Sequence, residues 1–130
     1  MGMRLVLVAA IAAVAVGWVI GRRTQLARQA ARPAPLPEVP AALRDGAPRT
    51  WVIFTTRYCV SCDRVEERVR AAEPDVRVVR VDAEREPLLA RSFRVRSAPT
   101  TVVADERGVV RARLVGAEAV EDYLRARTAS

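Results

Sequence analysis

Residues 51–70, WVIFTTRYCVSCDRVEERVR, decide the fold and contain the only two cysteines of the chain, Cys59 and Cys62. The apolar residues 51–55 are typical of a buried strand, and residues 56–58 of a turn. A helix is expected from about Cys59 to residue 72. Val65 and Val69 recur at the spacing that puts them on its inner face, and Pro74 ends it. A buried strand that leads directly into a helix indicates an α/β domain.

The cysteines are separated by two residues at the junction of strand and helix. On the first turn of a helix, this spacing brings both sulfurs to one face. Cys59 would then lie near unpaired helix N–H groups and the positive end of the helix dipole, which favour the thiolate, so we expect it to be the nucleophile. Cys62 lies one turn deeper and is expected to attack a mixed disulfide on Cys59 and release the substrate.

The cysteines have two other possible roles besides thiol–disulfide exchange. They could be buried residues without a reaction, or ligands of a metal ion. Zinc usually takes four protein ligands, and the chain has no histidine and no third cysteine, so a metal would need carboxylates or a second chain. The strand–turn–helix context favours a redox-active dithiol and no metal site.

Length and charge narrow the classes of function. A chain of 130 residues is expected to hold one domain. All 22 basic residues are arginines, and the net charge is +7. Part of this excess flanks the apolar N-terminus, and the rest is interspersed with acidic residues, as on a solvated surface. The six aromatic residues are not interleaved with the arginines, so nucleic-acid binding is not expected.

Residues 5–20, LVLVAAIAAVAVGWVI, carry no charge. As a helix they span about 24 Å, and flanking small residues and arginines extend them toward the roughly 30 Å of a bilayer core. We interpret residues 1–23 as an uncleaved, single-pass anchor in the cell membrane. The alternative is a cleaved signal peptide with residues 13–15, Ala-Val-Ala, as its processing site.

The orientation of the anchor follows from its flanking charges. Four arginines at positions 22, 23, 28 and 32 follow the span and Arg4 precedes it, so the positive-inside rule favours a cytoplasmic domain. The extracytoplasmic side stays open, because a domain that forms disulfides would face outward. Residues 24–49 form an Arg/Pro-rich linker. Its first part can continue the helix, and the four prolines in residues 32–40 favour an extended polyproline II spacer.

Residues 50–130 form the expected domain. Further strands are predicted at residues 76–82, 100–104 and 109–114, and helices at 86–93 and 117–127. Residues 105–108, DERG, form a hairpin turn between the last two strands. The order is βαβαββα, with a central mixed sheet flanked by helices. The β-α-β pieces predict parallel pairing through right-handed crossovers, and the hairpin adds an antiparallel edge.

From residue 50 to residue 127 the chain resembles the thioredoxin superfamily. FTTRYCVSC is similar to the strand–turn–CxxC motif of the family, and Ala98-Pro99-Thr100 stands where the family has its cis-proline loop. Gly108 and Gly116 also match family positions. Within the superfamily, the chain is similar to small membrane-tethered thioredoxin-like proteins of actinobacteria.

The resemblance implies a thioredoxin-like fold and a membrane-tethered thiol–disulfide oxidoreductase of the protein-disulfide reductase type, contributing to cell redox homeostasis. Cys59 and Cys62 would be catalytic, and Tyr58, Ala98 and a cis Pro99 would position the substrate. The reaction needs no cofactor beyond the Cys59–Cys62 pair. The implied partners are protein disulfides or dithiols, together with an electron donor or acceptor that the sequence does not identify.

The chain departs from the family pattern at several places. Val-Ser at residues 60–61 replaces Gly-Pro, and Asp63 stands where a basic residue is common and would oppose a thiolate. Ile53 and Val78 occupy the places of a buried aspartate and lysine. Water or Asp63 are the remaining candidates to take the proton of the second cysteine. These losses motivate the alternative function, a catalytically weak binding or metal-handling module.

Overall fold

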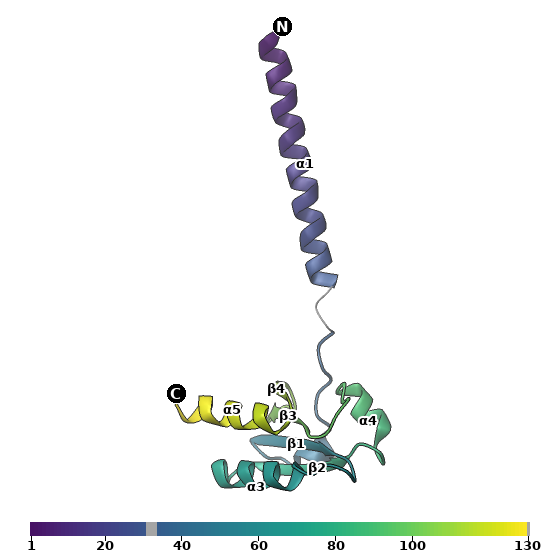
Figure 1. Ribbon diagram of the computed structural model, residues 1–130, viewed down its shortest axis with the longest axis vertical. Coiled ribbons are helices and arrows are strands. Elements are labelled where there is room, and N and C mark those ends of the chain that lie inside the picture. The colour runs from purple at the N-terminus through teal and green to yellow at the C-terminus, as the bar shows by residue number, and fades with distance from the viewer. Residues whose placement is uncertain (31–33, 130) are drawn as a thin grey trace. The chain divides into compact units, whose positions relative to one another are not determined.

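The computed structural model describes residues 1–30 and 34–129, which fall into two compact units, Met1–Pro35 and Leu36–Ser130 (Figure 1). The first unit consists of helix α1 (Gly2–Ala30), whose side chains are exposed from residue 1 to residue 28. Gly2–Arg28 is long and apolar enough to cross a membrane, a property that signal sequences share. The predicted continuation of the helix beyond the apolar run is confirmed as far as Ala30. The spacer predicted for residues 32–40 lies partly outside the described residues, at positions 32 and 33.

The second unit contains the predicted βαβαββα order, preceded by one short helix that the sequence did not predict. Its elements are α2 (Ala41–Arg44), β1 (Arg49–Thr55), α3 (Cys62–Ala72), β2 (Arg77–Asp82), α4 (Pro87–Ser92), β3 (Thr100–Asp105), β4 (Val110–Val115) and α5 (Ala117–Thr128). Pro87 opens α4 at a position that tolerates proline, because the first N–H groups of a helix have no partner within it. Gly116, with a φ of +88°, separates β4 from α5.

The sheet has the order β2-β1-β3-β4. β1 and β2 are parallel, as expected, and β3 and β4 form the predicted antiparallel hairpin. The prediction of a second parallel crossover is wrong, because β3 runs antiparallel to β1. A helix of six residues rises only about 9 Å, less than half the length of a strand of that size, so α4 does not carry the chain back along the sheet. β3 therefore enters from the edge at which β2 ends.

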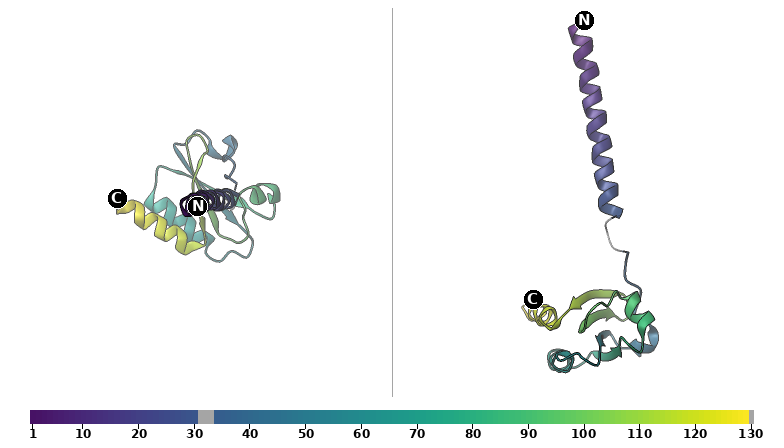
Figure 2. Two further views of the ribbon diagram at one scale, coloured as in Figure 1. Left: turned by 90° about the horizontal axis from the view of Figure 1, so that it is seen from above. Right: turned by 45° about the vertical axis from the view of Figure 1, so that its right-hand side comes forward.

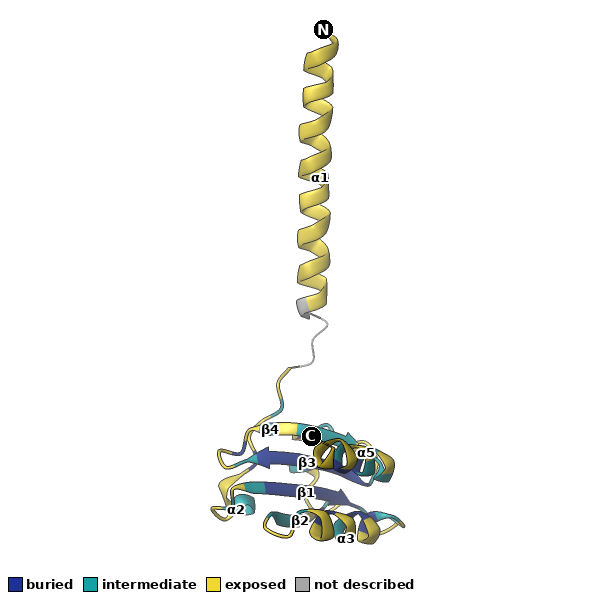
Figure 3. Ribbon diagram, turned by 90° about the vertical axis from the view of Figure 1, so that its left-hand side faces the viewer, coloured by how far each residue is buried: buried dark blue, intermediate teal, exposed yellow. Residues whose placement is uncertain are grey.

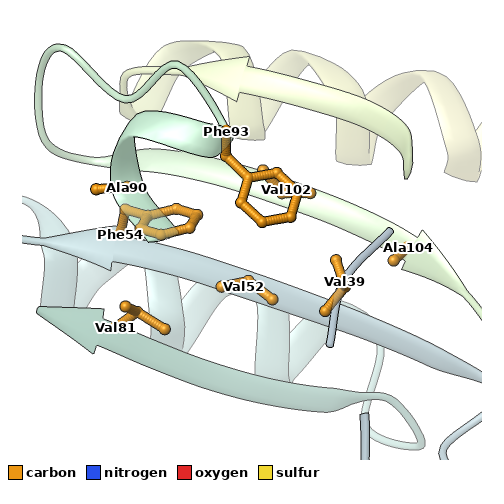
Figure 4. Packing of buried hydrophobic residues seen from close by; sticks show 8 residues of the cluster. All are labelled: Val39, Val52, Phe54, Val81, Ala90, Phe93, Val102 and Ala104. Atoms are coloured by element: carbon orange, nitrogen blue, oxygen red, sulfur yellow. The ribbon is translucent and has the colours of Figure 1, made fainter. Parts of the chain in front are cut away.

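Both faces of the sheet are covered, and the central strands β1 and β3 are buried along most of their length (Figure 3). On one face, α3 and α5 lie side by side and pack Val65, Val69 and Val120 against Trp51 and Ile53 (Figure 2). The opposite face carries a second cluster of eight buried residues, shown in Figure 4: Val39, Val52, Phe54, Val81, Ala90, Phe93, Val102 and Ala104. The alternation of β1 residues between the two clusters follows the two-residue period of a strand.

The segment before β1 packs against the sheet, although the sequence predicts a domain that begins only at residue 50. Val39 is 1% exposed and belongs to the second cluster. Its N–H donates a hydrogen bond to the Gly108 carbonyl over 2.8 Å, and the Arg44 guanidinium donates to the Val39 carbonyl over 2.9 Å. The compact unit accordingly begins at Leu36.

Candidate functional site

The two cysteines lie where β1 passes into α3 and are joined by a disulfide, with their Cα atoms 5.6 Å apart. The expectation that both lie on the first helical turn is wrong, because α3 begins at Cys62 and Cys59 precedes it. A turn holds the first cysteine in place, since the Cys59 N–H donates to the Thr56 carbonyl over 3.1 Å. The proposed effect of the helix dipole on Cys59 therefore acts from just outside the helix end.

The two sulfur-bearing residues differ in exposure. Cys62 is 0% exposed, and Cys59 is half-buried. The side chains around the loop are open to solvent, with Tyr58 77% and Val60 98% exposed. Cys59 is therefore the more accessible of the two cysteines, while Cys62 is shielded by the domain.

The register of the sheet brings the loop that contains Pro99 to the same edge. Phe54 pairs with Thr100, so Pro99 stands beside the carboxyl end of β1, from which the cysteine loop departs. The Ala98–Pro99 peptide is cis, as the resemblance implies. Pro99 is buried and its carbonyl accepts a hydrogen bond from the Gly116 N–H over 2.8 Å, whereas Ala98 is half-buried.

The charges around the cysteines are paired. Arg80 Nη1 donates to Asp63 Oδ1 over 2.5 Å and to Glu66 Oε2 over 3.2 Å. The hydrogen bond that Arg80 donates to Asp63 is the main cause that raises the pKa of Arg80 above its ordinary value. Asp63 therefore opposes a thiolate less than its isolated charge would, because a guanidinium offsets it. On the other side of the loop, Arg57 pairs with Glu84 over 3.1 Å.

Arg80 belongs to this site, although the sequence predicted no role for it. A signal was available in principle, because β2 runs parallel to β1 and its register sets Arg80 opposite Ile53. Finding it requires the pairing register, which the local pattern of β2 does not contain.

The resemblance places Ile53 and Val78 where the family has a buried charged pair, but the register does not set them opposite one another, because it pairs Ile53 with Arg80 and Val78 with Trp51. Ile53 is 0% exposed, and Val78 is half-buried and packs against the same cluster. Apolar packing at both positions avoids a single buried charge, which would be costly without its partner.

The metal alternative can be tested against the donor groups. No three His, Cys, Asp or Glu side chains gather as a possible metal site within residues 1–30 and 34–129. In the disulfide form, neither cysteine offers the thiolate that a metal would bind.

The chain matches a family model described as a thioredoxin-like domain over residues 38–127. It is similar to the oxidised form of mitochondrial thioredoxin 3 from Saccharomyces cerevisiae, with 24% identity, a TM-score of 0.55, and coverage of 65% of this chain and 84% of that chain. It is also similar to a mutant thioredoxin from Halobacterium salinarum NRC-1, with 23% identity, a TM-score of 0.54, and coverage of 68% and 85%. These likenesses to solved structures concern the fold.

No curated protein matches the chain. The family model nevertheless covers most of the compact unit that carries the disulfide, from just before Val39 to the last turn of α5. The chain therefore belongs to the family of thioredoxin-like domains.

Proposed function

We propose that this protein is a thiol–disulfide oxidoreductase that exchanges disulfides with protein substrates. The observation that carries the proposal is the unequal exposure of the disulfide, with Cys59 half-buried and Cys62 fully buried. In the reducing direction, the Cys59 thiolate attacks a substrate disulfide, forms a mixed disulfide and releases one substrate thiol. Cys62 then attacks Cys59, which restores the intramolecular disulfide and releases the second substrate thiol.

We further propose that Tyr58, Ala98 and Pro99 position the substrate. Tyr58 precedes Cys59 and is largely exposed, so its ring offers an apolar surface beside the reacting sulfur. Ala98 and Pro99 stand at the sheet edge from which the cysteine loop departs, as the pairing of Phe54 with Thr100 requires. A substrate segment that lies between these residues would present its sulfur to Cys59.

Membrane tethering through α1 and a protein-disulfide reductase activity complete the proposal. The length and apolarity of Gly2–Arg28 support the tether, and the arginines that follow the span favour a cytoplasmic domain. Disulfide reduction fits that compartment. A reduction potential near about −270 mV would support a reductant, and one near about −120 mV would identify an oxidant instead.

The decisive experiment compares Cys62→Ser with Cys59→Ser in cells. Cys62→Ser retains the attacking sulfur and lacks the resolving one, so it is expected to accumulate mixed disulfides with partner proteins. Cys59→Ser, the matched control, is expected to trap none, because buried Cys62 is shielded from substrates. Equal trapping by both variants, or by neither, contradicts the assigned roles.

A binding or metal-handling module is the second candidate. Ile53 and Val78, which stand where the family pattern has a buried aspartate and lysine, favour it because they provide no carboxylate for proton transfer. Reduction of insulin disulfides separates the two functions. Turnover that depends on Cys59 supports the oxidoreductase, whereas absence of turnover with stoichiometric metal release on thiol titration supports the module.

A further inference from the structure

Resolution by Cys62 poses a problem of acid–base chemistry. Cys62 is 0% exposed, and burial in apolar surroundings raises the pKa of a thiol because it disfavours the thiolate. The thiolate is nevertheless the form that attacks a mixed disulfide. If the proposed function holds, some group beside Cys62 must favour its ionised form.

The carboxylates nearest in sequence are poorly suited to this task. The Asp63 side chain is 80% exposed and pairs with Arg80. Glu66 pairs with both Arg80 and Arg70. Both carboxylates are therefore paired with guanidinium groups, whereas Cys62 is buried in the domain.

A buried hydroxyl lies on the sheet face that α3 covers. Thr101 of β3 is 0% exposed, and its Oγ1 has no hydrogen-bond partner among the residues that the structure describes. It pairs directly with Ile53 of β1, so both side chains project from the same face of the sheet. Figure 4 shows its neighbour Val102 on the opposite face, packed in the other cluster.

Helix α3 brings Cys62 to that same face. Ile53 packs against Val65 and Val69 of α3. Cys62 precedes Val65 by three residues and therefore lies one turn earlier on the same stripe of the helix. The two other buried hydroxyls at this end of β1 already donate hydrogen bonds, Thr55 to the Val81 carbonyl over 3.5 Å and Thr100 to the Ser97 carbonyl over 2.7 Å. Within the described part of the chain, the Thr101 hydroxyl is therefore a buried donor without an acceptor.

We propose that the Thr101 hydroxyl donates a hydrogen bond to the sulfur of Cys62 during resolution and thereby lowers the pKa of its thiol. In the disulfide form Thr101 Oγ1 makes no hydrogen bond within the described residues, so the proposed bond forms only when Cys62 is reduced. A thiolate is a much stronger acceptor, because the bond is then charge-assisted. Cys62 loses its proton, its sulfur bonds to that of Cys59, the mixed disulfide breaks, and the proton ends on the departing substrate thiolate. Thr101 acts through Cys62 and is a positioning residue.

The chain offers a matched control in Thr50. Its Oγ1 is also fully buried and without a partner in the described residues. Thr50 pairs with Ala104 of β3, which belongs to the cluster on the other face, and it stands near the beginning of β1, away from the cysteine loop. Replacing either threonine with valine removes one unpaired buried hydroxyl at nearly constant shape, so both variants are expected to fold.

The test follows the two steps of exchange separately. The reduced full-length chain in detergent is mixed with an excess of an aromatic disulfide that releases a coloured thiolate. Attack by Cys59 releases the first thiolate, and resolution by Cys62 releases the second. Thr101→Val is expected to leave the first release unchanged, to slow the second about tenfold at neutral pH, and to move its pH profile upward. Thr101→Ser keeps the hydroxyl and is expected to restore the second release, while Thr50→Val behaves as the wild type.

The proposal is overturned if the second release in Thr101→Val stays within about twofold of wild type, a change too small for a lost hydrogen bond to an ion. It is equally overturned if Thr50→Val slows that step by the same factor, or if Thr101→Ser fails to restore it. Thr101→Ala, which also lacks the hydroxyl, replaces the valine variant should valine prevent folding. Insulin reduction by the wild type tests the proposed function itself, so its failure is distinguishable from a failure of Thr101.

Discussion

Replacing Gly108 with alanine tests whether the segment before β1 is part of the domain. Gly108 has a φ of +87°, and an added Cβ would lie 2.7 Å from the Val39 carbonyl oxygen. Real Cβ atoms do not approach backbone oxygen that closely, so Val39 must move. Its displacement breaks the Val39–Gly108 hydrogen bond and the bond from Arg44 to the Val39 carbonyl.

The expected loss of stability has three sources. An alanine at positive φ costs about 1–2 kcal/mol. The two hydrogen bonds contribute about 1 kcal/mol each. Val39 is 1% exposed, so its partial exposure adds to the loss, up to about 1.5–3 kcal/mol if it becomes fully exposed. We expect Gly108→Ala to lower the free energy of unfolding by about 3–5 kcal/mol in total.

Gly116→Ala is the matched control. Gly116 has a φ of +88°, and nothing lies within 4 Å of an added Cβ. Because its ψ is 164°, the residue adopts a conformation that is essentially reserved for glycine, so the substitution introduces backbone strain without a collision and we expect a loss of about 1–3 kcal/mol. The difference between the two variants, about 2 kcal/mol, measures the docking of the segment around Val39.

Urea unfolding of the full-length chain in detergent provides the measurement. Trp51 is fully buried and reports on the core, and Trp18→Phe removes the signal of the other tryptophan, which lies in α1. Equal losses for the two glycine variants would refute the reasoning. The residues around Val39 would then not dock in solution, and the domain would begin near residue 50, as the sequence analysis expects.

Three further outcomes are expected. Arg80→Ala leaves the charge of Asp63 without its guanidinium partner, so the pKa of the Cys59 thiol rises. Alkylation of Cys59 measured against pH detects this rise as a shift of the rate profile to higher pH, and an unchanged rate profile contradicts the prediction. Reduction of the disulfide lowers the free energy of unfolding by about 2 kcal/mol, because its short loop no longer restricts the unfolded chain, and denaturant titrations of both forms check it. The hydrogen bond from Arg68 lowers the pKa of Glu121, so its stabilisation is complete above the ordinary value of 4.5 and is lost as pH falls below it. The stability difference between wild type and Glu121→Gln should therefore shrink on acidification; a constant difference contradicts the ion pair.

The sequence predicts those parts of the candidate site that lie close together along the chain. Cys59, Cys62 and Tyr58 stand within five residues, soon after an apolar run, so local pattern alone identifies the loop. Pro99 was placed beside this loop only through the family resemblance. Its proximity depends on the pairing of Phe54 with Thr100, two residues that are distant in sequence.

Local patterns were less informative about charge and burial at the site. The local sequence shows no basic partner for Asp63, but Arg80 of β2 donates a hydrogen bond to its carboxylate. Thr101 reads as one residue of an ordinary strand, and only the register with Ile53 assigns it to the face that α3 covers. A shift of one residue would move that side chain to the opposite face.

The sequence by itself determined the apolar N-terminal helix, the order of the strands and helices after it, and the loop that carries the cysteines. These features depend on hydrophobic periodicity, prolines and glycines, which act on near neighbours. Tertiary structure alone decided the antiparallel direction of β3, the docking of Val39 against Gly108, and the unequal burial of the two cysteines. Each of these depends on contacts between segments far apart in the chain, whose free energy becomes defined only when the whole sheet and its helices pack together.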